Sequence, residues 1–343
     1  MKIFSLLLTA LLGLAQAGSS GTLRIYVIDV EGGGATLVIA PSGQSMLIDS
    51  GSPGPAAERD SKRIADAMQA AGLTKINYLF TTHYDGDHVG GAPAANAVAH
   101  FDRFFDHGEM DPKWETNASG GARWEAYLAI AKGKRTITNA GDTIPLAGLR
   151  VDVVASHGSV IGKSINGGGA KNAFCNPADV KPPNTTENSQ STGVLVSYRG
   201  FTFLDAGDLT WDKETDLACP VNKLGRVSLL LATHHGFYND QSGAPALLWA
   251  IQPQVVIANN GPRKGMAANA YERIQKINGL EGLWQSHLAL ATDAAHNTSD
   301  DMIANPEASA DCKGHWIRVD VGSDHSFTVT NGRNNFSKTS HVR

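Results

Sequence analysis

Residues 82–91 read Thr-His-Tyr-Asp-Gly-Asp-His-Val-Gly-Gly and follow directly on the apolar run Asn-Tyr-Leu-Phe at 77–80. The apolar run predicts a strand, so a tight turn at its end can aim several side chains at one point, and Gly86 permits unusual backbone angles there. Imidazole and carboxylate groups are ligands that Zn²⁺, Mn²⁺ and Fe²⁺ accept. The stretch therefore predicts a site for one or two divalent ions. Its candidate ligands are His83, Asp85, Asp87 and His88.

Two later apolar runs end in side chains of the same kind. Phe201–Leu204 leads into Asp-Ala-Gly-Asp208, and Leu229–Ala232 leads into Thr-His-His-Gly236. Taken alone, the aspartate motif is typical of a polar turn, and the His-His motif is typical of a surface histidine pair. Three strand ends of this type in one chain favour a single metal site assembled from all of them.

In chain order, the motifs His-x-Asp-x-Asp-His-x-Gly-Gly, strand-Gly-Asp and His-His-Gly resemble those of the metallo-β-lactamase fold superfamily. The resemblance is to the branch that includes the soluble domain of the ComEC competence protein, and it covers nearly all of the chain after its N-terminal segment. It implies an α+β fold, a four-layered αββα sandwich of two mixed sheets with outer helices and metals at one edge between the sheets. The motifs say much less about the substrate.

The resemblance assigns roles to single positions. His83 and Asp85 match ligands of the first metal, and Asp85 stands where many relatives have a second histidine. Asp87 and His88 match ligands of the second metal, while Asp208 matches the carboxylate that bridges the two.

The resemblance also implies that one histidine of the pair His234 and His235 completes the second site and that the other faces the substrate. We take His234 as the ligand and His235, with Asp87, as catalytic, although the residues themselves leave this choice open. Many relatives have a further histidine where this chain has Glu-Asn-Ser-Gln-Ser at 187–191. The first site is then held by fewer strong ligands, so a single-metal enzyme is an alternative. His107 and His157 are spare ligand candidates, and ordinary hydrogen-bonding roles are favoured for both.

The expected cofactor is one or two Zn²⁺ ions, with Mn²⁺ or Fe²⁺ as alternatives. Two such ions can hold a hydroxide between them, because coordination lowers the pKa of water from about 15.7 toward 7. Asp87 would orient this nucleophile or take its proton. Asp49 ends another apolar run and is predicted either to orient a ligand histidine or to cap a turn.

The favoured activity is hydrolysis of a phosphoester or phosphodiester, with a small-molecule or oligonucleotide-like substrate, since the ComEC branch resembles nuclease-like proteins. Amide and cationic side chains are predicted to contact the anionic group. These candidates are Asn188, Asn260, Arg263 and Lys264. Alternatives are a lactone or β-lactam type amide hydrolase, which the polar stretch 158–191 disfavours, and a non-catalytic metal-binding scaffold. His287 and His296 belong to no motif and are expected at the surface.

The N-terminus has the features of a secretory signal: Lys2, an apolar stretch over 3–14 and the small-residue pattern Ala-Gln-Ala at 15–17. We predict a signal peptide at 1–17 and a single domain at 18–343, exported as a secreted or periplasmic protein. The apolar stretch is too short for a membrane span, and no later segment is long and apolar enough for one. Nothing in the sequence indicates an obligate protein partner.

Charge and cysteine content narrow the function further. Removal of the signal takes away one lysine and no acid, so the formal net charge moves from −4 to −5. Such a chain does not attract a long polyanion by bulk charge. The cysteines form no Cys-x-x-Cys pair, so we expect one disulfide and one free thiol rather than a thiolate zinc site. The pairing among Cys175, Cys219 and Cys312 is open.

Hydrophobic periodicity predicts alternating strands and helices after an initial strand meander. The predicted strands span 23–30, 35–40, 44–49, 75–82, 101–105, 143–145, 149–155, 192–198, 201–204, 227–232, 253–258, 316–321 and 326–330. The predicted helices span 57–71, 92–100, 122–132 and 267–277. The long polar stretch at 158–191 is predicted to be a functional or mobile loop.

Overall fold

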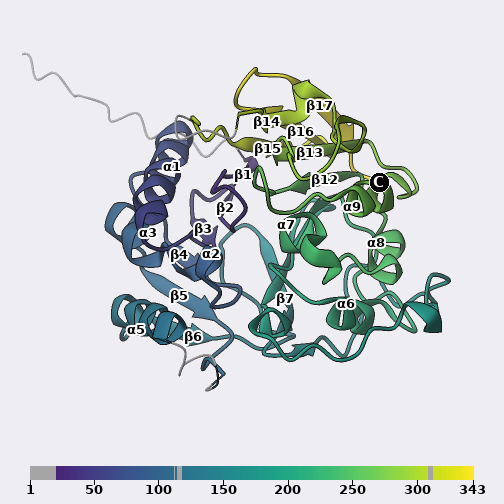
Figure 1. Ribbon diagram of the computed structural model, residues 1–343, viewed down its shortest axis with the longest axis horizontal. Helices are drawn as coiled ribbons and strands as arrows, with labels where there is room; N and C mark the ends of the chain where they lie inside the picture. The colour runs from purple at the N-terminus through teal and green to yellow at the C-terminus, as the bar shows by residue number, and fades with distance from the viewer. Residues whose placement is uncertain (1–20, 112, 114–117, 308–311) are drawn as a thin grey trace, which may run out of the picture.

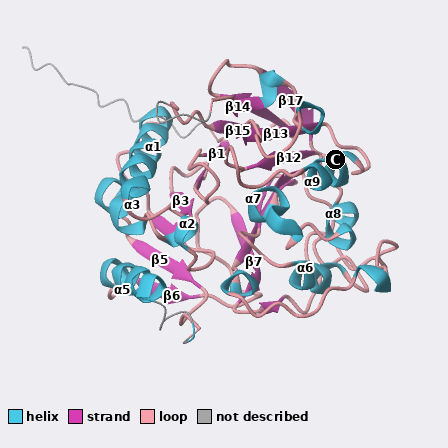
Figure 2. Ribbon diagram, in the orientation of Figure 1, coloured by secondary structure: helices cyan, strands magenta, loops and turns pink. Residues whose placement is uncertain are grey.

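Two mixed β-sheets face each other in the computed structural model, and helices cover their outer sides (Figures 1 and 2). The structure describes residues 21–111, 113, 118–307 and 312–343, so the predicted signal peptide lies outside the described residues. This arrangement confirms the predicted α+β sandwich. None of the described helices has the length and apolar character that a membrane span needs.

The first sheet has the order β17-β16-β15-β1-β2-β3-β4-β5-β6 in the described chain. β3 to β6 run parallel to one another, and the remaining neighbours are antiparallel. Its strands are β1 Leu23–Val27, β2 Thr36–Ile39, β3 Ser45–Ile48, β4 Tyr78–Phe80, β5 Arg103–Asp106, β6 Arg135–Ile137, β15 Ile317–Val321, β16 Ser326–Asn331 and β17 Ser337–His341.

The second sheet has the order β14-β13-β12-β11-β10-β9-β7-β8 in the described chain. β10 to β14 run parallel, whereas β9 is antiparallel to both β10 and β7. Its strands are β7 Arg150–Ser156, β8 Ser159–Val160, β9 Gly193–Tyr198, β10 Phe201–Asp205, β11 Leu229–Leu231, β12 Val255–Ala258, β13 Gly282–His287 and β14 Ile303–Asn305.

Helices cover the outer face of each sheet. The longest described helix, α1, begins at Pro55, whose fixed φ suits the first turn, and stops at Gly72, which adopts the left-handed conformation (φ 73°). The α-helical segments are α1 Pro55–Ala71, α2 Gly86–Val89, α3 Ala92–Ala99, α5 Ala118–Ala131, α6 Trp211–Ala218, α7 Thr233–Phe237, α8 Pro245–Ile251 and α9 Ala268–Gln275. Short 3₁₀ turns occupy η1 Pro177–Asp179, η2 Glu187–Gln190, η3 Tyr238–Asp240, η4 Ala294–His296 and η5 Asp300–Met302.

Three apolar clusters correspond to the three interfaces of the sandwich. In β11, Leu229 and Leu231 join the cluster between the sheets, whereas Leu230 joins the cluster beneath α6, α8 and α9. In β1, Ile25 packs between the sheets and Tyr26 packs toward α1, α3 and α5. Successive strand residues point to opposite faces, so strands buried on both sides read as continuous apolar runs in the sequence.

The predicted elements agree with the structure over most of the chain, with local exceptions. The predicted strand at 143–145 was wrong, because only Thr143 forms a bridge, to Asp152. The periodicity did not reveal β6, β13, β14, β17, α6 or α8. The predicted loop at 158–191 contains β8 and two 3₁₀ turns. A disulfide joins Cys175 in this stretch to Cys219, and Cys312 remains free, which agrees with the expected single bridge.

Buried Glu214 in α6 makes the stability of the fold sensitive to pH. Its carboxylate accepts a hydrogen bond from the backbone N–H of Ala244 (2.8 Å), but burial raises its pKa from 4.5 to about 7. The folded state therefore keeps a proton that the unfolded state loses above pH 4.5, so the free energy of unfolding falls as the pH rises toward 7.

Glu214→Gln removes this titration. We expect the unfolding free energy of the variant, relative to wild type, to be higher at pH 8 than at pH 5 by about 2 kcal/mol. Urea denaturation at the two pH values measures the difference. Glu125→Gln makes the same chemical change on the exposed face of α5 and is the control. An equal pH response in Glu214→Gln and wild type would contradict the prediction.

Candidate metal centre

The predicted ligands gather where the carboxyl ends of strands from both sheets meet. β3 and β4 run parallel in one sheet, and β10 and β11 run parallel in the other, so each pair ends at one edge. Asp49 follows β3, the segment 81–89 follows β4, Asp208 follows β10, and His234 with His235 follows β11. The strand-end positions noted in the sequence therefore share one site.

Asp87, His88, Asp208 and His235 form its tightest group. Each offers one ligand atom, and these atoms lie within 4.8 Å of one another. His88 Nε2 is 3.2 Å from both Asp208 Oδ1 and His235 Nε2, and His235 Nε2 is 3.1 Å from Asp87 Oδ2. Of the histidine pair, His235 thus lies in this group, beside the two predicted ligands of the second metal.

His234 lies outside this group, with Nε2 3.2 Å from Asp208 Oδ2, the oxygen that His235 Nε2 approaches at 3.4 Å. His83 Nε2 is 3.9 Å from the same oxygen and 3.8 Å from Asp85 Oδ2. Both carboxylate oxygens of Asp208 thus have a histidine nearby, since His88 lies at Oδ1 and the others lie at Oδ2, which is what a bridging carboxylate needs. The geometry makes His235 the better candidate for the second metal and places His234 nearer the predicted first one, while the metal ligation of each residue stays a prediction.

Asp49 orients the buried imidazole of His88. Asp49 Oδ2 lies 2.6 Å from His88 Nδ1, and the same carboxylate accepts hydrogen bonds from the backbone N–H and the hydroxyl of Thr82, both at 2.8 Å. A proton on Nδ1 that faces Asp49 leaves the lone pair of Nε2 directed into the site. This confirms the predicted contact between Asp49 and a candidate ligand histidine.

The buried carboxylates and imidazoles of the site shift one another's pKa values. Burial alone would raise the pKa of Asp208, but His235, His88 and His234 hold it well below its usual range. Burial alone would lower the pKa of His88, yet Asp208 and the other nearby carboxylates raise it well above its usual range. Burial lowers the pKa of His234 to about 4, so this imidazole is neutral near pH 7 and has a lone pair available.

Left-handed backbone conformations gather at the ligands. Asp49 (φ 59°), His234 (φ 52°) and His235 (φ 59°) all have positive φ, and α7 is a left-handed turn rather than a regular helix. Each such residue costs on the order of 1–3 kcal/mol and persists only where the surrounding structure holds it. The fold therefore holds these side chains in place at a cost in stability, which is typical of functional sites.

Glu187 is a buried carboxylate beside the site that the sequence did not single out. Its Oε1 accepts hydrogen bonds from the backbone N–H of Tyr84 (3.0 Å) and from His107 Nε2 (2.8 Å), while its Oε2 is buried without a hydrogen bond. Burial opposes ionisation, but His107 and then His83 lower its pKa. The sequence did offer a reason to examine Glu187, because it belongs to the stretch 187–191, where the family resemblance implied a further ligand. His107 is thus bound to Glu187, and exposed His157 does not line the site hollow.

A hollow of about 320 Å³ opens beside the ligands. Its lining residues are Asp85, Asp87, Thr186, Glu187, Asn188, Asp208, His234, Tyr238, Gln241 and Lys264. Of the predicted substrate contacts, the structure brings Asn188 and Lys264 to this hollow, and Lys264 Nζ lies 2.5 Å from Asp87 Oδ2. Arg263 is exposed outside the lining, and Asn260 is buried with its amide on the carbonyls of Gly261 and His287.

Buried polar atoms without hydrogen bonds show that the donor set fits a divalent ion. Asp208 Oδ1 and His83 Nε2 make no hydrogen bond of acceptable geometry, although both are sealed from solvent. Such an unsatisfied group costs about 1–3 kcal/mol. A divalent ion that accepts nitrogen and oxygen ligands would satisfy both atoms, and the site has no thiolate that would favour a softer metal.

Comparison with known proteins is consistent with this fold. Residues 29–163 match the family model described as the metallo-beta-lactamase superfamily, a region that contains the four candidate ligands after β4. The two-sheet architecture is consistent with the metallo-β-lactamase fold. Residues 29–163 are thus similar to that superfamily, and the chain has a histidine–aspartate cluster that is a candidate metal centre. The comparison with curated proteins finds no match.

Several solved structures are similar at low identity. A variant metallo-β-lactamase from Cronobacter sakazakii is 17% identical, with 60% of this chain and 75% of that chain covered and a TM-score of 0.37. A metal-dependent hydrolase from Parabacteroides distasonis is 13% identical, with 76% and 92% covered and a TM-score of 0.41. CmlA, a diiron β-hydroxylase from Streptomyces venezuelae, is 15% identical, with 76% and 47% covered and a TM-score of 0.39.

Proposed function

We propose that this protein is an exported metal-dependent hydrolase that acts on phosphoester or phosphodiester substrates. The observation that carries the proposal is the convergence of Asp87, His88, Asp208 and His235 within 4.8 Å beside an open hollow. Nitrogen and oxygen donors that are buried, oriented and adjacent to a substrate-sized space are the arrangement of a hydrolytic metal centre. Zn²⁺ is the first candidate for this donor set, and Mn²⁺ or Fe²⁺ are alternatives.

When bound, a divalent ion would lower the pKa of a water molecule and polarise the bond to be cleaved. His88 and Asp208 would hold the ion, together with one or both histidines of the pair after β11. Asp87 faces the hollow and contacts both His235 and Lys264, so its carboxylate is placed to orient the attacking water or to accept its proton. Asp49 keeps the His88 ring in the required tautomer.

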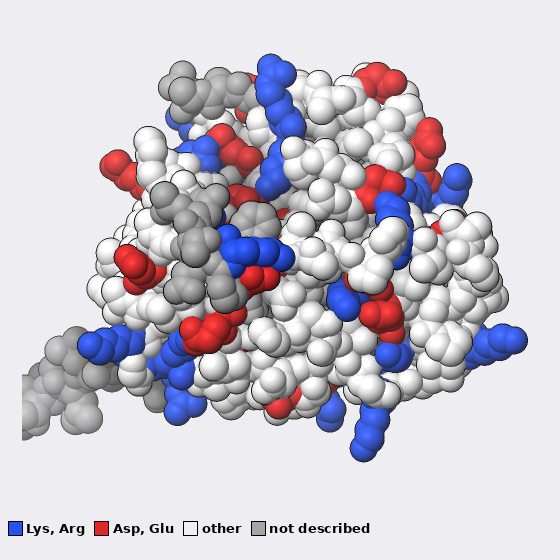
Figure 3. Space-filling view, turned by 60° about the horizontal axis from the view of Figure 1, so that its bottom comes forward, with Lys and Arg blue, Asp and Glu red and all other residues white. Residues whose placement is uncertain are grey.

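The polar lining of the hollow supports an anionic ester. Lys264 provides a cation at its edge, and Asn188 provides an amide. A neutral lactone or β-lactam ring would favour an apolar wall, which these lining residues do not provide. On the face shown in Figure 3, basic and acidic side chains are interspersed rather than separated by sign. With a net charge of −4, this distribution favours a short ester over a long polyanion.

Two further features support the finer parts of the proposal. A disulfide between Cys175 and Cys219 is typical of an oxidising compartment, which agrees with export by the N-terminal segment. The ComEC-like branch is supported by Asp85 and by the stretch 187–191, each of which stands where many relatives have a histidine.

Reconstitution with Zn²⁺, Mn²⁺ or Fe²⁺, followed by turnover assays on a phosphodiester, a phosphomonoester, a lactone and a β-lactam, tests the function. We expect bis-p-nitrophenyl phosphate or p-nitrophenyl phosphate to be cleaved faster than an acyl lactone or nitrocefin. Preferred cleavage of the lactone or nitrocefin would overturn the proposed substrate class, but the proposal of a hydrolase would stand. Absence of both bound metal and turnover would favour a scaffold protein instead.

Lys264→Ala tests the contact with an anionic substrate. A hydrogen bond from a charged donor contributes about 1.5–3 kcal/mol, so we expect kcat/KM for bis-p-nitrophenyl phosphate to fall roughly tenfold to a hundredfold. The neighbouring Arg263 is exposed outside the hollow, and Arg263→Ala removes the same charge as a matched control. Equal losses in the two variants would mean that general charge, rather than a contact in the hollow, sets the effect.

A further inference from the structure

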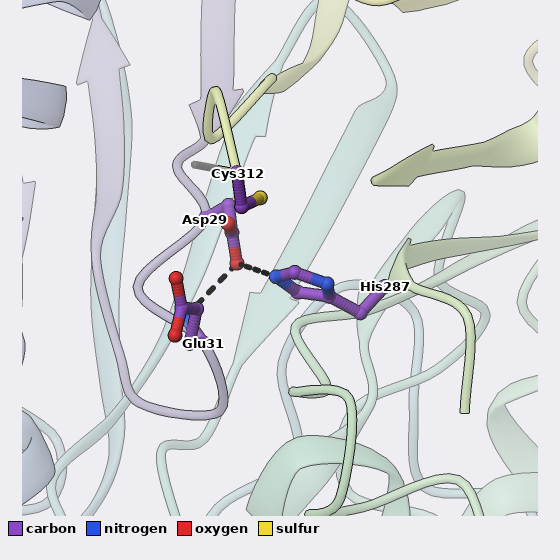
Figure 4. A group of neighbouring side chains, drawn as sticks. All are labelled: Asp29, Glu31, His287 and Cys312. Carbon is purple, nitrogen blue, oxygen red and sulfur yellow. Dashed lines mark hydrogen bonds and ion pairs between the residues drawn. The ribbon is translucent and has the colours of Figure 1, made fainter. Parts of the chain in front are cut away.

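A second group of potential ligands lies apart from the candidate metal centre: Asp29, Glu31, His287 and Cys312 (Figure 4). One ligand atom from each lies within 4.8 Å of the others. Asp29 and Glu31 follow β1, Cys312 precedes β15, and His287 is the last residue of β13 in the facing sheet. The group therefore joins the two sheets and combines oxygen, nitrogen and sulfur donors.

His287 is the observation that points to a ligand. It was expected at the surface but is 1% exposed, because β13 is covered on both faces. Its Nε2 lies 2.8 Å from Asp29 Oδ1, within ion-pair distance, but neither ring nitrogen makes a hydrogen bond of acceptable geometry. Figure 4 shows the ring pointing into the group, toward Asp29 and the thiol. A buried imidazole that lacks hydrogen bonds and faces a carboxylate and a thiol has the surroundings of a metal ligand.

Arg63 holds the carboxylates from outside the group. Its guanidinium donates to Asp29 Oδ2 (2.8 Å), to Glu31 Oε1 (2.9 Å) and to the backbone carbonyl of Cys312 (3.1 Å). Asp29 Oδ1 accepts a hydrogen bond from the backbone N–H of Glu31 (2.9 Å) and lies 2.8 Å from His287 Nε2. Both carboxylate oxygens of Glu31 are engaged, since Arg59 binds Oε2 at 2.7 Å. The arginine contacts hold the Asp29 carboxylate and the backbone of Cys312, and Glu31 must release one arginine before it can bind an ion.

The donor types and spacing match Zn²⁺. Zinc accepts imidazole nitrogen, carboxylate oxygen and thiolate sulfur, and tetrahedral ligand atoms around it lie roughly 3.3–3.8 Å apart. Atoms that already lie within 4.8 Å of one another reach this spacing by small side-chain adjustments. A surface cavity of about 260 Å³ is lined in part by Asn305, His315 and one member of the group, Cys312.

We propose that Asp29, His287 and Cys312 form a second zinc site, which Glu31 completes. Binding releases the thiol proton of Cys312 to solvent and leaves the sulfur as a thiolate ligand. The turn after Glu31 packs on the first centre: Gly34 N–H donates to the carbonyl of Asp87 (3.0 Å), and Asn259 donates to the carbonyl of Gly33 (3.0 Å). An ion at the second site would therefore fix the turn on which the candidate metal centre rests.

Titration with Co²⁺ tests the site through its sulfur ligand. The candidate metal centre contains no cysteine, and Cys175 is bonded to Cys219, so a thiolate-to-cobalt charge-transfer band reports Cys312 alone. We expect this band with one equivalent of Co²⁺ in both wild type and Asp208→Asn, and its displacement by Zn²⁺. Persistence of the band in Asp208→Asn separates this site from the proposed catalytic one, whatever the activity of the protein.

Two variants test whether Cys312 and His287 bind the same ion. Cys312→Ser should abolish the band, and His287→Gln should weaken Co²⁺ affinity at least about tenfold. His296→Gln changes a partly exposed histidine that pairs with Asp293 and should leave the affinity unchanged. Absence of a thiolate band in wild type would overturn the proposal. So would an unchanged affinity in a folded His287→Gln protein, since the thiol would then bind cobalt without the buried histidine.

Discussion

Asp208→Asn is expected to lower turnover of bis-p-nitrophenyl phosphate by at least about a thousandfold and to remove the metal from the main centre. Asp208 is 2% exposed and lies within 3.9 Å of four histidine side chains, His83, His88, His234 and His235. An amide of the same shape keeps one oxygen but loses the negative charge that balances a divalent ion. Metal content per chain and steady-state kinetics measure the two effects separately.

The matched control for this variant is Asp216→Asn, which makes the same change at an exposed position of α6. It should retain both metal and turnover. If Asp208→Asn kept its metal but lost activity, Asp208 would act on the substrate rather than hold the ion. If it kept both, the proposed centre would be wrong.

Gly34→Ala is expected to reduce metal affinity at the main centre by about a hundredfold or more and to destabilise the fold by about 1–3 kcal/mol. A Cβ on Gly34 would lie 2.7 Å from Asp49 Oδ2, 2.8 Å from His88 Nδ1 and 2.9 Å from Asp49 Cβ. Asp49 and His88 are only 2.6 Å apart, so the added methyl group must separate them or displace the turn. Either movement releases the ring that directs Nε2 at the ion.

Competition with a chromogenic chelator measures the affinity, and thermal unfolding measures the stability. Gly162→Ala is the control, because a Cβ there meets nothing within 4 Å. A Gly34→Ala protein with normal metal affinity would show that the Asp49–His88 contact does not position the ligand. Loss of stability with unchanged affinity would confine the effect to packing.

Much of the fold could be predicted because buried strands appear in the sequence as continuous runs of apolar residues. β1 to β4 and β9 to β12 are apolar runs whose two faces are both covered, and α1 ends at a glycine that the left-handed cap requires. The strands that were not predicted contain fewer apolar residues. β13 contains Gln285 and His287, and β17 reads Ser-Lys-Thr-Ser-His, so neither run is apolar enough to indicate a strand. Their pairing with neighbours of the same sheet determines them.

The candidate site, too, could be predicted from the sequence only in part. Asp87 and His88 are adjacent in the sequence and so share one turn. Asp208 and the histidine pair follow other predicted strands, which predicts that they lie nearby. The sequence could not distinguish His234 from His235, because adjacent residues diverge according to backbone angles. Both have left-handed φ values, 52° and 59°, and both rings reach Asp208 Oδ2, but only that of His235 joins the group with Asp87. Burial of Glu187 also depends on partners far away in the chain, Tyr84 and His107.

The sequence by itself determined the donor chemistry and the strand-end positions of the ligands, because side-chain type and hydrophobic periodicity are local properties, and the resemblance of its motifs implied the two-sheet architecture. Only the tertiary structure decided which histidine meets Asp87, that Lys264 rather than Arg263 faces the hollow, and that His287 is buried against Asp29. These outcomes depend on contacts between strands of opposite sheets. Such contacts follow from how the layers pack and leave no periodic signal along the chain.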